Sequence, residues 1–351
     1  MWFCCFGIAA EEDEAEKIEK RVSPKSVHTD HLSALFPYAV HGQQQFLRRR
    51  EMKKSRVLAL MVCMMAVVNV ASADTIRGIN MDFVNIGNAG NAPDTGGTVG
   101  CGAVSSNYRI GKYEVTAAQW QTINTAAGIG NSGGWSGNQP VALISWYEAA
   151  QFCNYLTSGN KYSGAYKFDI SGNFQVIDRV SSISTYGTTY VIPTEDEWYK
   201  AAYHKNDGVT GNYWLYPTQS NDVPSNDLID PDPGNNANFY QDGYTIGSPD
   251  YLTAVGEFEN SDSAYGTFDQ GGNVWEWNET LIGGSRRGIR GGSFGSFDDS
   301  LRSSYRSIGR YPNFELDDVG FRVASVPEPA TICLFGLGVL SLIRKIEAQR
   351  K

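Results

Sequence analysis

The sequence predicts a loop-rich globular body of mixed helices and strands rather than a helical bundle. Apolar residues make up 41% of the 351 residues, which allows a sizeable core and excludes wholesale disorder. Glycine accounts for 38 residues, well above its usual share of about 7%, and charged residues for only 19%. Aromatic residues reach 12%, so large rings are available to hold many turns around one core.

The N-terminal part has the pattern of a targeting segment. Residues 52–73 start with Met52 and basic residues, continue as an apolar run over 57–70, and end in Ala-Ser-Ala. A basic start, a short apolar run and a small-x-small site are typical of a secretory signal peptide. We therefore expect Met52 to be the true start and residues 1–51 to be an over-called extension. The alternative is a genuine N-terminal region followed by a membrane helix, but the run is short for the roughly 20 residues of a span.

The C-terminal part has a second targeting pattern. Residues 326–351 begin Val-Pro-Glu-Pro, continue as an apolar run over 330–343, and then turn basic at Arg344 and Lys345. This order resembles the PEP-CTERM sorting signal, a bacterial tag that an exosortase processes. A frayed C-terminal helix is the alternative.

Both ends together predict a protein that is exported to the cell envelope, outer surface or extracellular matrix of a Gram-negative-type bacterium. Its expected partners are the secretion machinery and an exosortase, with membrane contact only through the C-terminal segment. Residues 74–325 remain as the predicted domain and contain 28 acidic and 15 basic residues. Because polynucleotides and anionic lipids need a basic surface, we do not expect this acidic body to bind them.

Cysteine and histidine are scarce in the predicted domain, which holds only Cys101, Cys153 and His204. A catalytic zinc site needs about three protein ligands rich in these residue types, so the domain cannot build one. Export permits a disulfide, but the sequence does not decide whether the two cysteines pair. Cys153 falls on the inward face of an apolar helix, which favours a buried thiol. His204 is expected at a helix C-terminus rather than in a catalytic triad.

Local patterns predict the elements of the body in order. Residues 108–116 alternate and are rich in aromatic and β-branched side chains, which indicates a strand. Thr116 then caps a helix over 117–127. Residues 160–190 are expected to form an inserted hairpin around a Ser-Gly turn. Residues 206–250 are rich in Asn, Asp, Gly, Pro and Tyr and are expected to form a long irregular segment, of the kind that ions often hold.

Two further helices carry a Ser/Thr-x-x-Glu capping box. Ser145 with Glu148 begins the first, and Thr194 with Glu197 begins the second. An apolar stripe follows each box and predicts its buried face. The stripes are Ala149, Phe152, Cys153 and Leu156 in the first helix, and Trp198, Ala201 and Ala202 in the second.

Six segments occur in one order: GKYEVT, PVALISWYEAAQFC, IPTEDEWYKAA, FDQGGNVWEW, RGGSF and GFRVA. Together they resemble the sulfatase-modifying-factor, or formylglycine-generating-enzyme, family over residues 105–325. The resemblance implies an α+β fold: a single compact, loop-rich formylglycine-generating-enzyme-like domain related to C-type lectin folds.

The resemblance also implies a chemistry that this chain lacks the residues to perform. The family oxidises a cysteine of a target sulfatase to formylglycine, with copper held by two cysteines that follow the RGGS motif. Ser296 stands where the first of them would be, and residues 154–332 contain no cysteine. Thiolate suits copper(I) and a serine hydroxyl does not, so we do not expect copper. A branch of the superfamily that uses iron on three histidines is excluded by the single histidine.

Calcium binding is the property that the resemblance carries over. It implies one site at Asp269, the backbones of Gly272 and Val274, and Glu276. It implies a second site, with less regular spacing, at Asn238, the backbone of Phe239, Asp250 and the backbone of Leu252. Such hard oxygen ligands suit calcium. The alternative is that Asp269 caps a turn and that Glu276 is a surface or arginine-paired carboxylate.

The remaining motif residues have a structural and a functional interpretation. Trp275 and Trp277 are expected in the core. Four arginines are expected to pair with carboxylates inside the fold, or else to line a cleft for a carboxylate or sulfate group. They are Arg290, Arg302, Arg306 and Arg322. The candidates for lining a cleft are Ser293, Ser296, Trp275 and Tyr305.

Three functions remain compatible with these residues. The first is a non-catalytic, calcium-stabilised binding or matrix protein whose loops at 128–139, 206–250 and 295–300 bind an extracellular polysaccharide or protein. The second is a formylglycine-generating-type or other metal-dependent oxidase with a divergent active site. The third is a structural surface protein that needs only calcium and its anchor, and the sequence does not separate it from the first.

Overall fold

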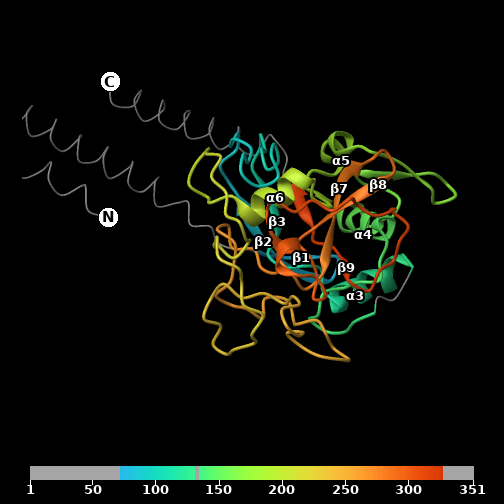
Figure 1. The fold of residues 1–351 in the computed structure, drawn as a ribbon. Helices are drawn as coiled ribbons and strands as arrows, with labels where there is room; N and C mark the ends of the chain where they lie inside the picture. Colours follow the sequence, from blue (N-terminus) through green and yellow to red (C-terminus); the bar gives the residue numbers. More distant parts are fainter. Residues whose placement is uncertain (1–71, 131–133, 327–351) are drawn as a thin grey trace, which may run out of the picture. The chain divides into compact units, whose positions relative to one another are not determined.

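Segments from both ends of the domain meet in one antiparallel sheet of five strands. The computed structural model describes residues 72–130 and 134–326 (Figure 1). Most of the predicted signal peptide and nearly all of the sorting segment therefore lie outside the described residues. The strand order is β1-β2-β3-β10-β6. The strands are β1 (Ser72–Ile76), β2 (Ile79–Ile86), β3 (Tyr108–Gly111), β6 (Thr189–Val191) and β10 (Ala324–Val326).

Strand β1 overlaps the predicted cleavage point. Ser72 pairs with Phe83 and Ala73 with Asp82, while the other three residues of β1 pair with Ile79, Asn80 and Met81. Cleavage after Ala73 would remove the first two pairs and leave the part of the hairpin next to its turn.

Two helices pack beside this sheet and enclose the main core. Helix α3 (Ala117–Ala127) begins at Thr116, and α4 (Trp146–Ser158) begins at Ser145; both capping boxes form in full. The stacked rings of Trp120 and Phe152, 5.6 Å apart between centroids, join the two helices. Cys153 is fully buried in α4, as its place in the apolar stripe predicts.

The inserted region contains a hairpin, as predicted, and a helix that was not. Strands β4 (Tyr166–Phe168) and β5 (Phe174–Ile177) form the hairpin. Helix α5 (Arg179–Tyr186) follows it, although its serine, threonine and β-branched residues are poor helix formers. The Asp178 side chain accepts a hydrogen bond from the amide of Ser181 and supplies the N-cap. Helix α6 (Glu195–Tyr203) then begins at Thr194 with the second predicted capping box, and His204 is its C-cap.

The last motifs of the sequence form a small third sheet of order β8-β7-β9. Its strands are β7 (Trp275–Ile282), β8 (Arg286–Arg290) and β9 (Val319–Gly320), with β9 parallel to β7. A short 3-10 helix, η1 (Asp298–Leu301), follows β8. Residues 205–274 form no helix or named strand, and they run as loops beside the sheets (Figure 1). This confirms the predicted irregular segment and extends it.

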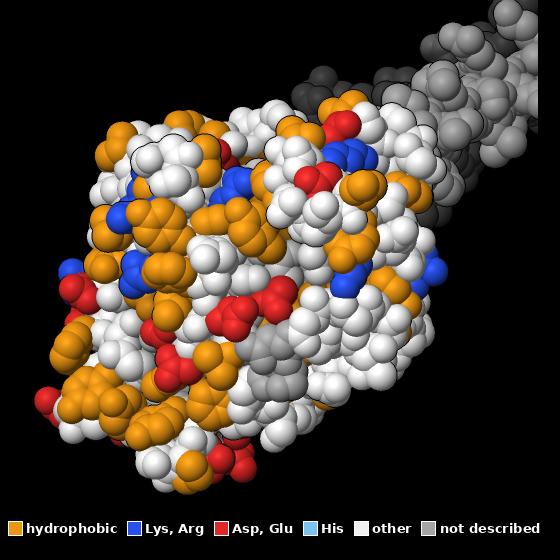
Figure 2. Space-filling model, turned by 90° about the vertical axis from the view of Figure 1, so that its right-hand side faces the viewer, with side chains coloured by type: hydrophobic (Ala, Val, Ile, Leu, Met, Phe, Trp, Pro, Cys, Tyr) orange, Lys and Arg blue, Asp and Glu red, His pale blue; other side chains and the backbone are white. Residues whose placement is uncertain are grey.

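The surface keeps many large hydrophobic side chains. Figure 2 shows a face with hydrophobic side chains scattered across it, basic ones among them in its upper half, and a group of acidic side chains near its middle. Within residues 72–130 and 134–326, no helix is both long and apolar enough to cross a membrane.

Candidate functional site

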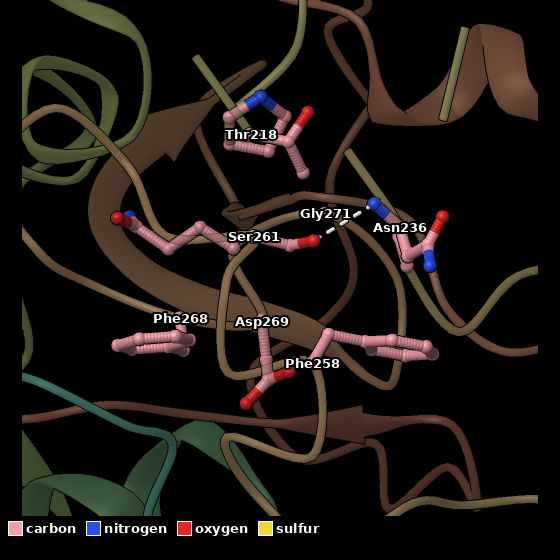
Figure 3. Close-up of a pocket in the computed structure, with 10 residues that line it drawn as sticks. Thr218, Asn236, Phe258, Ser261, Phe268, Asp269 and Gly271 are labelled. Carbon is pink, nitrogen blue, oxygen red and sulfur yellow. Dashed lines mark hydrogen bonds between the residues drawn. The ribbon is translucent and has the colours of Figure 1, made fainter. Parts of the chain in front are cut away.

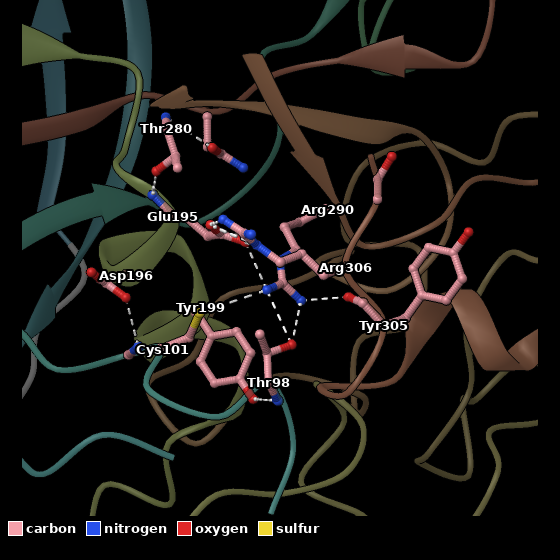
Figure 4. A network of polar contacts seen from close by, with 12 residues as sticks. Thr98, Cys101, Glu195, Asp196, Tyr199, Thr280, Arg290, Tyr305 and Arg306 are labelled. Atoms are coloured by element: carbon pink, nitrogen blue, oxygen red, sulfur yellow. Dashed lines mark hydrogen bonds and ion pairs between the residues drawn. The ribbon is translucent and has the colours of Figure 1, made fainter. Parts of the chain in front are cut away.

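The RGGS motif leaves strand β8 through a buried arginine network (Figure 4). Arg290 contacts Glu195, the first residue of α6, with 2.7 Å between its Nη2 and the carboxylate Oε1. Arg306 contacts the other oxygen of Glu195 at 2.7 Å. Burial alone would raise the pKa of Glu195, but hydrogen bonds and charge from Arg306 and Arg290 hold it below its usual range. The Glu195 carboxylate thus pairs with two arginines, and its contact with Arg290 links the PTEDEW motif to the RGGS motif.

Arg290 also organises the loop around Cys101. Its guanidinium donates to Thr98 Oγ1 at 3.1 Å and to the carbonyl of Tyr305. The Cys101 thiol lies 3.8 Å from Arg290 Nη2. Burial, followed by the charge of Glu195, raises the pKa of Cys101. Reactive cysteines have lowered pKa values, so the geometry does not activate this thiol. Cys101 and Cys153 are both free, so the structure shows no disulfide between them.

The four cleft candidates come together as two pairs joined by Asp318. Ser296 Oγ accepts from the amide of Ser293 at 3.0 Å, and the two hydroxyls are 3.2 Å apart. Ser293 donates to Asp318 Oδ2 at 3.1 Å. The amide of Trp275 donates to the Asp318 carbonyl at 2.8 Å, and its ring lies 5.8 Å from that of Tyr305. No local pattern in the sequence singles out Asp318.

These residues do not fit the copper of the oxidases that the sequence resembles. The position of the first cysteine holds the Ser296 hydroxyl, which is already engaged with Ser293. The nearest thiol of the network, Cys101, belongs to a different loop and contacts Arg290. Copper(I) prefers thiolate ligands, and one thiol with a raised pKa does not make a pair.

The first predicted calcium set has its glutamate charge already balanced. Glu276 is fully buried and makes two contacts of 2.6 Å with the Arg322 guanidinium. It also accepts from Trp198 Nε1 at 2.7 Å. The arginine-paired alternative for Glu276 is therefore the arrangement that this geometry supports. Glu114, which the sequence analysis missed, accepts from the amide of Val274 at 3.3 Å.

Asp269, in the same set, serves as a turn residue. Its backbone is left-handed with φ 61°, and its Oδ2 accepts from the amide of Gly256 at 2.6 Å. Burial raises the pKa of Asp269 to about 6. Asp269 helps line a cavity of about 10 Å³, with its carboxylate between the rings of Phe258 and Phe268 (Figure 3). A cavity of roughly that size holds one water molecule.

The second predicted calcium set contains an oxygen without a partner. Asn238 is buried, and its Oδ1 makes no hydrogen bond to the described residues. Its amide nitrogen donates to the Tyr251 carbonyl at 3.0 Å and to Asn273 Oδ1 at 3.1 Å, which fixes the orientation. The Asp250 carboxylate of the same set is exposed. An unsatisfied buried oxygen is costly, and amide and carboxylate oxygens are calcium ligands. Of the two predicted sets, this is the one in which a buried side-chain oxygen has no partner among the described residues.

The four arginines of the motif region all pair with carboxylates, which confirms their structural interpretation. Arg290 and Arg306 share Glu195, Arg322 pairs with Glu276, and Arg302 pairs with Asp298 at 2.9 Å. Trp275 and Trp277 are buried, as expected for core residues.

Comparison with known proteins identifies two parts of the chain. Residues 102–326 match the Sulfatase-modifying factor enzyme 1-like domain, and residues 325–346 match the PEP-CTERM protein-sorting motif. The chaperone protein LppX of Paenibacillus barcinonensis is 31% identical over 104 residues, which are 28% of this chain. The match spans only 36% of that relative's length.

Three solved structures are similar to this chain. Treponema denticola variable protein 1 is 22% identical, with a TM-score of 0.49 over 75% of this chain and 100% of its own. CarF is 21% identical, with a TM-score of 0.47 over 70% and 97% of the two chains. PvdO from Pseudomonas aeruginosa is 18% identical, with a TM-score of 0.48 over 73% and 98%.

Proposed function

The chain belongs to the sulfatase-modifying factor enzyme 1-like domain family, and from this premise we propose that it is an exported binding protein without the family's oxidase activity. Its domain is followed by a PEP-CTERM motif, which implies sorting to the cell envelope by an exosortase. The proposed protein is displayed at the outer surface or in the matrix, and it binds an extracellular polymer through its loops.

One observation carries the proposal: the RGGS segment is built as a closed polar network rather than as a thiol site. Ser296 replaces the first cysteine, and its hydroxyl bonds to the amide and hydroxyl of Ser293. The Ser293 hydroxyl in turn donates to Asp318. The Arg290 guanidinium pairs with Glu195 and donates hydrogen bonds to neighbouring carbonyls. The side chains around the motif therefore satisfy one another and offer no soft ligand for copper.

Calcium is part of the proposed function as a stabilising ion. The unpartnered Oδ1 of Asn238 supports a site at Asn238, Phe239, Asp250 and Leu252. These residues lie in the irregular segment, which has few regular backbone hydrogen bonds to fix it. An ion that binds only the folded loop stabilises it by mass action.

The experiment that tests the proposal measures catalysis and metal content together. The purified protein is incubated with copper, oxygen and a cysteine peptide from a sulfatase, and formylglycine is measured by mass spectrometry. A family member that keeps both cysteines is the positive control. We expect no formylglycine, no copper, and calcium in the purified protein. Formylglycine above the no-protein background, or copper near one per chain, would overturn the proposal.

A further inference from the structure

Five aromatic rings form a connected cluster beside the RGGS loop. We call the following residues the aromatic cluster: Tyr240, Tyr244, Tyr251, Phe294 and Phe297. Ring centroids are 5.0 Å apart for Tyr240 and Tyr244, 5.5 Å for Tyr240 and Phe297, and 4.9 Å for Tyr244 and Tyr251. Tyr251 and Phe294 stack at 5.4 Å with 24° between their planes. Two loops that are far apart in the chain supply these rings.

The backbone of the cluster is fixed, and two of its five rings are exposed while the other three are half-buried. The amide of Tyr240 donates to the Ser296 carbonyl at 2.9 Å, and that of Phe294 donates to the Asn273 carbonyl at 2.9 Å. Tyr244 is 47% exposed and Phe297 is 61% exposed. Core formation alone would bury such rings, and a contiguous exposed apolar patch commonly marks a binding surface.

A polar hollow adjoins the cluster. It has a volume of about 380 Å³ and is lined by residues 223–227 with Gln241 and Asp242. Gln241 and Asp242 lie between Tyr240 and Tyr244 in the chain. Asp227 and Asp242 are exposed, so two carboxylates line the hollow. Asn226, at its wall, donates to the carbonyls of Phe239 and Gly243 at 3.1 and 3.0 Å. These hydrogen bonds join the wall of the hollow to the backbone next to Tyr240 and Tyr244.

The charge around the cluster selects among ligands. Residues 206–285 contain 13 acidic residues and no lysine, arginine or histidine, but Asp232, Glu276 and Glu279 among them are buried. The charge that a ligand would meet at the hollow is that of Asp227 and Asp242, the two charged residues that line it. Such a one-sided distribution attracts cations and repels polyanions. Exposed aromatic faces also attract ammonium groups within about 6 Å of the ring centre. The surface is thus complementary to a ligand that combines flat apolar faces with positive charge.

The backbone argues against a peptide as that ligand. Residues 205–274 provide no named strand, so no free strand edge is available there for an extended peptide to pair with. We propose that the aromatic cluster and the hollow bind a glycan that carries free amino groups, with sugar rings on the aromatic faces and ammonium groups near Asp227 and Asp242. This inference rests on the proposed function and names the ligand class of its loops.

The test compares three oligosaccharides of equal length with the full chain by isothermal titration calorimetry. They are the hexamers of glucosamine, N-acetylglucosamine and glucose. We expect the glucosamine hexamer to bind at least about tenfold more tightly than the other two, and to weaken with added salt. The double variant Tyr244→Ala, Phe297→Ala should lose about tenfold in affinity. Asp242→Asn should reduce the preference for the free amine.

The matched control is the double variant Tyr311→Ala, Phe314→Ala, which removes two rings of similar exposure elsewhere on the surface. It should bind like the unchanged protein. Equal binding of the acetylated hexamer, unchanged binding after loss of Tyr244 and Phe297, or tighter binding of hexalysine would each overturn this inference. None of those results restores oxidase activity, so the proposed function is judged separately by the formylglycine assay.

Discussion

Arg322 and Glu276 form a two-point ion pair that is fully buried. Nη2 of Arg322 lies 2.6 Å from Oε1 of Glu276, and Nε lies 2.6 Å from Oε2. The same guanidinium donates to the carbonyls of Gly111 and Phe268. Burial opposes the charge on Arg322, but Glu276, Glu114 and Asp269 hold its pKa above the usual range. One cation thus compensates a buried acidic region and ties β7 to the last segment of the domain.

We expect Arg322→Met to lower the free energy of unfolding by about 3–5 kcal/mol, since it leaves a buried carboxylate without its partner. Urea denaturation with linear extrapolation measures the loss. If that variant does not fold, Arg322→Met combined with Glu276→Leu should recover a folded protein, because replacing both partners by apolar residues is often neutral.

The control for this prediction is Arg302→Met. Arg302 pairs with Asp298 at 2.9 Å, but the two side chains are 39% and 34% exposed. An exposed pair contributes at most about 1 kcal/mol. Equal losses for the Arg322 and Arg302 variants would contradict the importance of the buried pair.

Gly272 and Gly284 have similar positive φ angles but different surroundings. Alanine variants at these two positions therefore distinguish the cost of backbone strain from that of steric overlap. Gly272 has φ 90° and Gly284 has φ 84°, so alanine is strained at either position. Only at Gly272 would the added Cβ overlap a backbone atom, the carbonyl oxygen of Asn238. We expect Gly284→Ala to cost about 1–2 kcal/mol. Gly272→Ala should cost clearly more, as measured by thermal unfolding. Similar melting temperatures for the two variants would show that the loop moves away freely.

Lys200 should make the free energy of unfolding depend on pH in the alkaline range. It is buried in α6, and its Nζ donates to the Asn88 carbonyl at 2.9 Å. Burial lowers its pKa to about 8. The unfolded value is about 10.4, so between these pH values the unfolded chain binds more protons and the contribution of Lys200 to stability rises with pH. Below about pH 8 that contribution is constant.

The measurement is the unfolding free energy of the unchanged protein minus that of Lys200→Met, taken at several pH values. We expect the difference to be flat below about pH 8 and to increase from there toward pH 10. Lys205→Met is the control, since Lys205 is only half-buried and its ammonium lies 4.0 Å from the centroid of the Trp214 ring. A difference that falls with pH would contradict the assignment.

Local signals predicted the parts of the fold that local chemistry determines. The N-cap at Thr116 and the capping boxes at Ser145 and Thr194 located three helix starts to the residue, because the hydrogen bonds of a cap lie within four positions. Helix α5 escaped prediction because Asp178 caps a stretch of poor helix formers. Strands β1 and β2 were not assigned from the sequence at all.

Partners that are distant in the chain could not be read from the sequence. Strand β10 pairs with β3 across more than half of the chain, and no local pattern specifies that register. The same holds for the site. The family resemblance implies that Glu276 is a calcium ligand, but its carboxylate forms an ion pair with Arg322, which comes from another segment of the chain. Asp318 and Glu114 likewise gain their roles only through tertiary contacts.

Two variants of the second predicted calcium set should change the stabilisation by calcium in opposite directions. Asn238→Asp loses the hydrogen bonds that the amide nitrogen donates to Tyr251 and Asn273, and it buries a carboxylate. We therefore expect it to be less stable than the unchanged protein in chelator, and to gain more from added calcium, since a carboxylate is a stronger ligand. Asp250→Asn should gain less. Melting temperatures with chelator, with calcium and with magnesium measure these shifts.

The size of the calcium effect follows from mass action. At a free concentration of 100 times the dissociation constant, calcium adds about 2.7 kcal/mol to the stability of the folded protein. Asp222→Asn, an exposed aspartate of the same irregular segment, is the control and should keep the full shift. Magnesium should give a smaller shift, because it demands a tighter octahedral shell than these loop oxygens offer. If the chelator does not change the melting temperature, or if calcium raises the melting temperature of all variants equally, then Oδ1 of Asn238 binds no ion.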